Sequence, residues 1–339
     1  AAFLADWNNS HPVNVEPGQA NLSGWPLYMV PACERAHLAW NVGGRPQPQD
    51  VSLIGRTALP AEVDKTVWLT DRCLEDLATP TTEPIMAVWS VDPPHAYWAV
   101  QDPWYSSVDP GTIQLPANRS RPDHVNAVNT PGCRLYDILG EEGVRELLRC
   151  YFAMVNRVDE MVGRILGSLE ARGRLDETII VFTSDHGDSN GAHGIVGKAA
   201  DTMYEETTKA PLLIRYPQVV PAGRRVRTPV GAVDVMPTIL DLCGFPVPEA
   251  VQGRSLRPLL EGSEDPGRPA FCEKTHSPTG RYRRMIRMGD WKCVTRMAPG
   301  RKPAFEVYNL AMDPGEEHNL ADDPEHAGVR EVLLAELAA

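Results

Sequence analysis

The sequence predicts an α/β protein with a mostly parallel sheet flanked by helices, followed by a small antiparallel α+β domain. Continuous apolar runs of strand length, separated by a long amphipathic helix, predict the first part. Strands without apolar–polar alternation are buried on both faces, which is typical of a parallel sheet covered by helices. Hairpin-like segments after about residue 266 predict the second part. We therefore expect one domain over residues 1–262 and a smaller one over residues 263–339.

The elements of the first domain follow from the spacing of apolar residues. Residues 1–60 are rich in Pro, Gly, Asn and Trp, and we expect irregular structure there. Apolar side chains of residues 64–77 fall on one helical face and predict a short amphipathic helix. Residues 84–91 form a continuous apolar run and predict a buried strand. Steps of three and four predict a long helix over residues 141–171, which Gly173 ends.

The later elements continue the same alternation of strands and helices. Residues 178–183 predict a second buried strand, and residues 211–216 predict a third. Asp234 can cap the helix that follows it. In the second domain, residues 284–287 and 291–295 flank a Met-Gly-Asp turn and predict a hairpin.

Composition argues against several classes of protein. The 339 residues are 42% hydrophobic and 23% charged, as is ordinary for a soluble globular protein. The net charge of −12 argues against nucleic-acid binding, because phosphate backbones are bound by clustered Lys and Arg. No apolar run approaches the roughly 20 residues of a membrane span. The seven cysteines form no CxxC pair, which favours free thiols over a disulfide framework.

Two properties of the protein stay open at this point. The chain begins with Ala1 and shows no basic start followed by an apolar stretch, as a signal peptide would have. The location is therefore cytoplasmic, or periplasmic or secreted, depending on the natural amino terminus. The oligomeric state is likewise not specified by any pattern in the sequence.

The candidate chemistry lies where the second predicted strand ends. Ligands of open α/β sheets bind beyond the carboxyl ends of the strands, and Asp185 and His186 lie there. A carboxylate suits Ca²⁺ or Mg²⁺, and an imidazole also admits Zn²⁺ or Mn²⁺. The glycines that follow allow the chain to fold back and bring Lys198 near the metal. The alternative is an Asp-His-Gly turn that closes a core strand, with Lys198 in solvent.

The segment over residues 183–217 resembles the sulfatase family. It contains, in order, Ser-Asp-His-Gly-Asp at 184–188, His-Gly-x-x-Gly-Lys at 193–198, Met-Tyr-Glu-Glu at 203–206 and Pro-Leu-Leu-Ile-Arg-Tyr-Pro at 211–217. This ordered combination is specific, whereas Asp-His-Gly alone is weak. Further matching segments continue to Asp-Pro-Gly-Glu at 313–316. The resemblance implies an alkaline-phosphatase-like fold and metal-dependent cleavage of a sulfate ester of a small molecule or sugar.

The resemblance implies a role for each candidate residue of this segment. Asp185 and His186 would be metal ligands, usually for Ca²⁺. Lys198 would pair with the sulfate oxygens and offset charge in the transition state. His193 occupies the loop-histidine position of the family, where it could contact substrate, although we favour a structural role.

A second candidate segment is the Pro-Pro-His sequence that ends at His95. By resemblance, His95 would hydrogen-bond the sulfuryl group or the leaving oxygen, and could act as the general acid. The alternative is a loop histidine without a role in catalysis. We expect residues 85–90 and 178–183 to be neighbouring or near-neighbouring parallel strands. His95 and Asp185 would then share one edge of the sheet.

Basic residues of the predicted carboxyl-terminal hairpin form a third candidate group. Arg283 and Arg287 lie close to His276 in the sequence. In a sulfatase-like fold they could bind an acidic or sulfated substrate through bidentate contacts. The alternative is a solvated basic face on an acidic protein.

Three features that the resemblance calls for do not occur in the sequence. Sulfatases convert the Cys or Ser of a Cys/Ser-x-Pro-x-Arg motif to formylglycine, and residues 31–35 and 132–134 both fail this pattern. The Asp-Asp pair that completes the metal site is missing, as is a Gly-Lys-Trp-His segment. All three belong to the first third of the family. We therefore expect the nucleophile to lie upstream, in an amino-terminal part that this chain lacks.

Two other functions remain compatible with these residues. A phosphate or phosphonate ester hydrolase could use the same fold, because tetrahedral anions share the same metal and lysine contacts. An upstream Cys/Ser-x-Pro-x-Arg motif would favour the sulfatase, and a bare Thr or Ser would favour the phosphohydrolase. A non-catalytic anion-binding protein, or pseudo-enzyme, is the third possibility.

Overall fold

The computed structural model describes residues 38–39, 51–52, 54–57, 60–122, 131–198, 202–276 and 281–338. The chain folds into two compact units. Unit 1 comprises Ala1–Pro116, Pro131–Leu175 and Gly194–Gly197, and unit 2 comprises Ala117–Thr130, Asp176–His193 and Lys198–Ala339. The expected domain boundary between residues 262 and 263 falls inside unit 2 and stays a prediction.

Unit 1 is built on two long helices and short strand pairs. The helices are α2 (Lys65–Ala78) and α4 (Pro131–Ala171), and the strands are β1 (Leu38–Ala39), β2 (Val51–Ser52), β3 (Ile54–Arg56) and β4 (Trp98–Val100). Strand β1 pairs with β2 in antiparallel orientation, and β3 pairs with β4 in parallel orientation. Single turns of 3-10 helix occur at Ala61–Val63, Tyr105–Ser107 and Pro110–Thr112.

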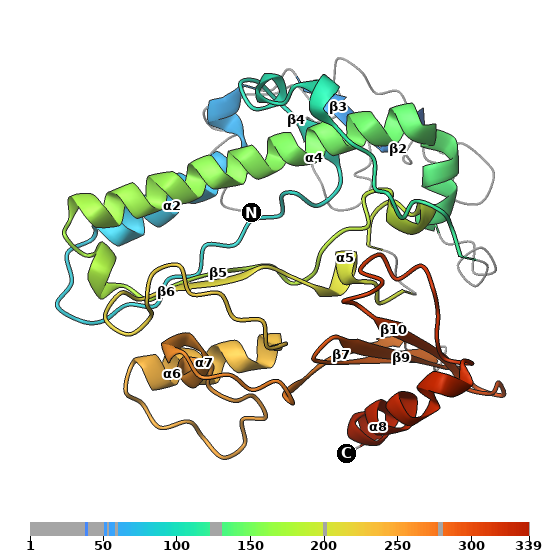
Figure 1. The fold of residues 1–339 in the computed structure, drawn as a ribbon. Helices are drawn as coiled ribbons and strands as arrows, with labels where there is room; N and C mark the ends of the chain where they lie inside the picture. The colour runs from blue at the N-terminus through green and yellow to red at the C-terminus, as the bar shows by residue number, and fades with distance from the viewer. Residues whose placement is uncertain are drawn as a thin grey trace. The chain divides into compact units, whose positions relative to one another are not determined.

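The two helices of unit 1 confirm the predictions made for residues 64–77 and 141–171. Helix α2 begins after Asp64, whose Oδ1 accepts a hydrogen bond from the Thr66 backbone N–H at 2.8 Å. The same carboxylate pairs with the buried guanidinium of Arg157 on α4, and α2 lies along α4 (Figure 1). Helix α4 begins earlier than predicted, because helical turns continue on both sides of a kink at Gly140, where φ is 59°.

The predicted buried strand at residues 84–91 is wrong. These residues are in no described strand, and most of their apolar side chains face solvent: Met86 is 81% exposed and Val88 is 76% exposed, whereas Trp89 packs against the core. A continuous apolar run is buried only where neighbouring strands pair with it and helices cover it. No described strand pairs with this run. Residues 84–91 belong to unit 1 and residues 178–183 to unit 2, so their expected arrangement as neighbours stays a prediction.

Unit 2 contains two sheets and four helices in the described residues. Its strands are β5 (Ile180–Thr183), β6 (Leu212–Arg215), β7 (Pro269–His276), β8 (Arg281–Met288), β9 (Trp291–Met297) and β10 (Ala304–Asn309). Its helices are α5 (Glu205–Thr208), α6 (Val235–Leu242), α7 (Arg257–Glu261) and α8 (Ala327–Ala338). Single turns of 3-10 helix occur at Leu175–Glu177, Ala192–Gly194, Ala232–Asp234 and Pro324–His326. Strands β5 and β6 confirm the positions of the strands predicted at 178–183 and 211–216, and they pair in antiparallel orientation. The predicted burial of the first is wrong, because Phe182 of β5 is 39% exposed.

The carboxyl-terminal sheet of unit 2 is antiparallel, in the order β10-β9-β8-β7. The predicted hairpin is formed by β8 and β9, and Gly289 takes a φ of 57° at its turn, which suits a residue without a Cβ. Helix α8 covers this sheet (Figure 1), and Ile286, Cys293, Val307 and Leu333 form a buried core there. The α/β class and its antiparallel carboxyl-terminal sheet agree with the predicted fold class.

Asp234 does not cap helix α6 with its side chain, contrary to the prediction. Its carboxylate instead accepts backbone hydrogen bonds from Gly231 at 2.9 Å and Arg254 at 2.8 Å. The buried guanidinium of Arg268 pairs with it at 2.8 Å. The carboxylate thus joins three segments, and a buried acidic group takes the strongest donors within reach.

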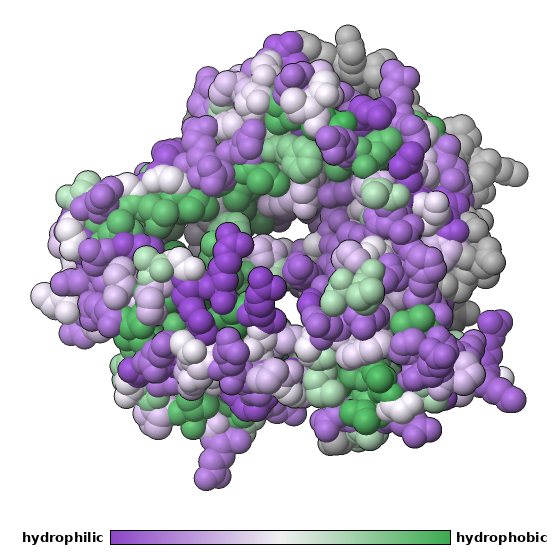
Figure 2. Space-filling model, viewed as in Figure 1, coloured by the Kyte–Doolittle hydropathy of each residue, from purple (hydrophilic) through white to green (hydrophobic). Residues whose placement is uncertain are grey.

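The surface is mostly hydrophilic on the face that Figure 2 shows, where apolar side chains form separate groups. None of the described helices has both the length and the apolar character required to cross a bilayer. The cysteines within the described residues are free, as predicted, and Cys133, Cys150 and Cys293 are buried.

Candidate active site

The candidate site is formed by the turn that follows β5 in unit 2. The Thr183 hydroxyl donates to the Pro211 carbonyl at 3.0 Å, and the Ser184 hydroxyl donates to the His186 carbonyl at 2.6 Å. These bonds fold the chain sharply just after the strand. Asp185 is therefore held at the tip of the turn, where its side chain is 85% exposed.

The ring of His186 is oriented by a backbone carbonyl. Its Nδ1 lies 2.8 Å from the Gly187 oxygen, which can only accept, so Nδ1 carries the proton. The lone pair of Nε2 is then free to accept, and the Lys198 ammonium lies 3.4 Å from it. Asp185 Oδ2 lies 3.5 Å from the same Nε2. The turn thus brings a carboxylate, an imidazole nitrogen and an ammonium together.

The donor chemistry of this turn fits part of a divalent-cation site. Histidines that bind metals usually donate their second ring N–H to a carbonyl or carboxylate, as His186 does to Gly187. The exposed Asp185 carboxylate adds a hard oxygen donor beside Nε2. No group of three His, Cys, Asp or Glu residues that could hold a metal occurs within the described part of the chain. The metal-ligand roles of Asp185 and His186 stay predictions.

The turn packs tightly against helix α5. The Gly187 backbone N–H donates to the Thr207 carbonyl at 2.9 Å. A Cβ placed on Gly187 would lie only 2.0 Å from the Glu206 carbonyl oxygen, so no other residue fits at this position without a shift of the backbone. The glycine after His186 is therefore required by close packing as well as by the turn.

His193 is buried and held by structural partners. Its side chain is 1% exposed, and its ring stacks on Tyr204 with centroids 3.6 Å apart. Its Nε2 lies 3.6 Å from Glu206 Oε2. Burial would raise the pKa of Glu206, but the nearby His193 ring and the hydrogen bond from Asn118 outweigh it and lower that pKa. These contacts support a structural role, while a substrate contact stays a prediction.

Asn118 belongs to the group of contacts around His193 and Glu206, although no pattern in the sequence identifies it. Its side-chain N–H₂ group donates to Glu206 Oε1 at 2.8 Å and to the Gly315 carbonyl at 3.1 Å. It also lies 3.3 Å from His193 Nε2. Its partners are distant in the sequence, so no local spacing could have identified it.

His95 lies in unit 1 and is exposed. Its backbone N–H donates to the Asp92 carbonyl at 2.9 Å, and its Nδ1 lies 2.7 Å from the Ala96 carbonyl. This contact places a proton on Nδ1 and leaves Nε2 as the nitrogen that can exchange a proton with a substrate. The predicted sheet edge shared with Asp185 stays a prediction.

The basic residues of the hairpin are largely committed to acidic partners. Arg287 pairs with Glu205 Oε2 at 2.5 Å, and Arg284 pairs with Glu273 at 2.7 Å. Arg283 lies on β8 opposite Lys274 of β7. His276 has no described side chain, so the expected grouping with it lies outside the described residues. Substrate contacts by Arg283 and Arg287 stay predictions.

Comparison with protein families gives two matches. The sulfatase family model matches residues 39–245, and the model described as N-sulphoglucosamine sulphohydrolase, C-terminal, matches residues 191–339. A curated relative is the N-acetylglucosamine-6-O-sulfatase of Bacteroides thetaiotaomicron, 37% identical over 201 residues. That alignment covers 56% of this chain and 35% of the relative, so the chain spans about a third of the curated relative it matches.

Solved structures of similar fold extend the comparison. A protein in complex with its substrate D-glucosamine-2-N,6-O-disulfate is 26% identical, with a TM-score of 0.66 over 80% of this chain and 68% of that chain. The phosphonate monoester hydrolase of Agrobacterium radiobacter is 28% identical, with a TM-score of 0.71 over 84% of this chain and 61% of that chain.

Proposed function

Because the chain belongs to the sulfatase family, we propose that it supplies part of the active site of a sulfuric-ester hydrolase. The observation that carries this proposal is that two charged groups approach the ring of His186. Asp185 Oδ2 lies 3.5 Å from His186 Nε2, and the Lys198 ammonium lies 3.4 Å from it. A carboxylate and an imidazole nitrogen are donors for a cation, and an ammonium is a partner for anionic oxygens. A sulfate ester requires both contacts at once.

Each residue has a distinct task in the proposed reaction. Lys198 pairs with the sulfuryl oxygens and offsets the charge that develops in the transition state. His95 donates a proton to the leaving oxygen as the general acid. Asp185 and His186 hold a divalent cation, which we propose to be Ca²⁺ because a carboxylate is the more exposed donor. When bound, that cation polarises the sulfuryl oxygens as a Lewis acid.

The nucleophile is proposed to lie outside this chain. The sulfatase family generally uses a divalent metal and formylglycine, and the sequence has no Cys/Ser-x-Pro-x-Arg motif in which formylglycine could form. We place that motif and the remaining metal ligands upstream. The chain alone should therefore be inactive.

The proposed substrate is a sulfate ester of a sugar. Two similar proteins support this class: one is an N-acetylglucosamine-6-O-sulfatase, and the other was solved with D-glucosamine-2-N,6-O-disulfate. Neither relative assigns which hydroxyl or amine of the sugar carries the sulfate here.

Turnover of nitrocatechol sulfate tests this proposal. Chain 1–339 should show no activity above background, and a longer chain that includes the upstream coding sequence should be active. In that longer chain, Lys198→Ala should lower turnover by roughly a hundredfold to a thousandfold. Lys302→Ala, which changes an exposed lysine of the β9–β10 turn, should leave turnover unchanged. Hydrolysis by chain 1–339 that is lost in a Lys198→Ala variant would overturn the proposal.

Phosphonate ester hydrolysis is the second candidate. The similarity to a phosphonate monoester hydrolase over 84% of this chain favours it, because tetrahedral anions share the same contacts. Phenyl phosphonate esters and nitrocatechol sulfate, offered to the same longer chain, separate the two. A higher kcat/KM for the phosphonate would assign the second function.

A further inference from the structure

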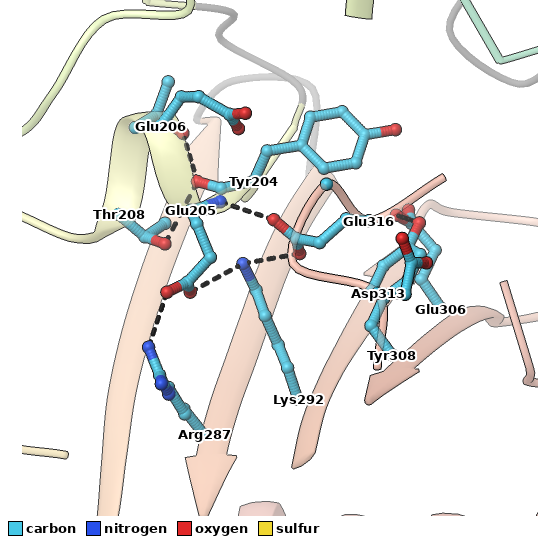
Figure 3. A network of polar contacts seen from close by, with 12 residues as sticks. Tyr204, Glu205, Glu206, Thr208, Arg287, Lys292, Glu306, Tyr308, Asp313 and Glu316 are labelled. Carbon is cyan, nitrogen blue, oxygen red and sulfur yellow. Dashed lines mark hydrogen bonds and ion pairs between the residues drawn. The ribbon is translucent and has the colours of Figure 1, made fainter. Parts of the chain in front are cut away.

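The region behind the candidate site contains an unusual buried ammonium. Lys292 lies on β9, and its side chain is 0% exposed. Its Nζ lies 2.8 Å from Glu316 Oε1 and 3.3 Å from Glu205 Oε1 (Figure 3). Arg287 pairs with the other oxygen of Glu205. Two cations and two carboxylates therefore neutralise each other, and the fully buried Lys292 and Glu316 are paired, as buried charges require.

The network fixes the start of helix α5. Glu316 is 1% exposed, and its Oε2 accepts a hydrogen bond from the Glu205 backbone N–H at 2.6 Å. Helix α5 has only four residues, and a helix of that length is not stable without tertiary contacts. The position of α5 is therefore fixed by Arg287 and Lys292 of the carboxyl-terminal sheet and by Glu316, which follows β10 (Figure 3).

Helix α5 in turn holds the candidate site at two points. The Thr207 carbonyl accepts from Gly187, the residue after His186. The Glu206 carboxylate lies beside His193, with 3.6 Å between Glu206 Oε2 and His193 Nε2. Lys198 contacts the same turn through His186 Nε2, at 3.4 Å. Because Gly187 packs against the Glu206 carbonyl with no space for a Cβ, the turn follows any movement of the helix. A displacement of α5 would thus change where His186 lies.

We infer that Lys292 is a positioning residue, which aligns His186, and with it the contact between His186 and Lys198, through Glu205 and helix α5. Its ion-pair partners Glu205 and Glu316 are not among the groups proposed to bind the metal or the sulfate. Burial raises the pKa of Glu316, and the charge of Lys292 opposes that effect by lowering it, so the two groups depend on each other. This role of Lys292 extends the proposed function. Only its expected effect on sulfate binding rests on that function, whereas its expected effect on the His186 ring does not.

The state of the His186 ring tests the inference without any assumption about substrate. Nitrogen-15 correlation spectra of chain 1–339 at one fixed pH report which ring nitrogen carries the proton. The native chain should show the Nδ1–H form that the Gly187 carbonyl selects. Lys292→Met should convert it to a mixture of forms, because α5 no longer holds Gly187.

Two further variants separate positioning from general loss of stability. Val307→Ala removes a buried contact of the same sheet without touching α5, and it should leave the His186 spectrum unchanged. Glu205→Gln keeps the size of the side chain that links Lys292 to α5 and should reproduce the effect of Lys292→Met, even if the latter does not fold. An unchanged His186 spectrum in folded Lys292→Met or in Glu205→Gln, or an equal change in Val307→Ala, would overturn the inference.

Binding of inorganic sulfate gives the second readout. Calorimetry on the native chain and on Glu205→Gln should show a dissociation constant roughly tenfold higher in the variant, because a displaced His186 no longer holds the Lys198 ammonium in place. Absence of sulfate binding by the native chain would count against the proposed function alone. The spectra of His186 would still decide the inference. Equal sulfate affinity in both chains, with a changed His186 spectrum, would show that Lys292 positions His186 but not Lys198 and would overturn that half.

Discussion

The turn that carries Asp185 lies in the same unit as the buried junction, the network formed by Lys292, Arg287, Glu205 and Glu316. The two regions differ in exposure and in pairing. Asp185 is mostly exposed, and His186 Nε2 lies 3.4 Å from the Lys198 ammonium and 3.5 Å from the Asp185 carboxylate. Lys292 and Glu316 are buried and paired at 2.8 Å. The polar atoms of the exposed turn can therefore still bind a ligand. The charged groups of the buried network are already paired with one another, so the two regions should respond differently to mutation.

The largest expected effect on stability comes from the buried junction. Lys292→Met leaves Glu316 buried without its cation, and this should lower the free energy of unfolding by about 3–5 kcal/mol. Urea denaturation measures the loss. The double variant Lys292→Met with Glu316→Gln removes both charges and should recover most of it. A loss below about 1 kcal/mol, the range of an exposed ion pair, would contradict the comparison.

A smaller effect is expected where the turn meets helix α5. Gly187→Ala puts a Cβ within 2.0 Å of the Glu206 carbonyl and should cost about 1–3 kcal/mol, as overpacking does. Gly163→Ala is the matched control, because Gly163 lies inside α4 with no atom within 4 Å of the new Cβ. That change should stabilise the protein by about 0.5–1 kcal/mol. Equal effects of the two variants on thermal unfolding would contradict the close approach of Gly187 to the Glu206 carbonyl.

The sequence predicted most elements whose pattern is local. Apolar periodicity located α2 and α4, and the Met-Gly-Asp turn located the β8–β9 hairpin. The prediction of a buried strand failed at residues 84–91. An apolar run indicates that burial is favourable but does not indicate which strand will pair with it. The pairing of β5 with β6 was not predicted either, since strand direction depends on distant segments.

The approach of Lys198 to His186 was predicted, whereas the residues that hold the turn in place were not. The spacing of glycines correctly brought Lys198 to His186, because a turn of that length is local. The residues behind the turn could not be identified in this way. Asn118 and Glu316 meet Glu206 and Glu205 across 88 and 111 positions of the chain, and only the fold brings them together.

A modest effect of pH is expected at Glu206. Its pKa is lowered because the nearby His193 ring and the hydrogen bond from Asn118 outweigh burial, which acts in the opposite direction. A carboxyl whose pKa is lowered in the folded state adds stability above its unfolded pKa of about 4.3 and loses it as pH falls through the folded value. Wild type should therefore exceed Glu206→Gln in stability at pH 7, and the difference should shrink below pH 4. Urea unfolding at both pH values measures it, and a constant difference would contradict the assignment.

The smallest expected effect is on cation binding by the chain alone. Asp185 and His186 offer two donors, whereas Ca²⁺ takes six to eight, so water must supply most of the shell. The Lys198 ammonium, 3.4 Å from Nε2, further opposes a cation at that position. Calorimetry should thus detect weak Ca²⁺ binding or none, and Lys198→Ala should increase the affinity slightly because it removes a like charge. Tight stoichiometric binding that Asp185→Ala abolishes would instead mean that this chain supplies further ligands. The exposed turn would then be a complete site, and the contrast with the saturated junction around Lys292 would disappear.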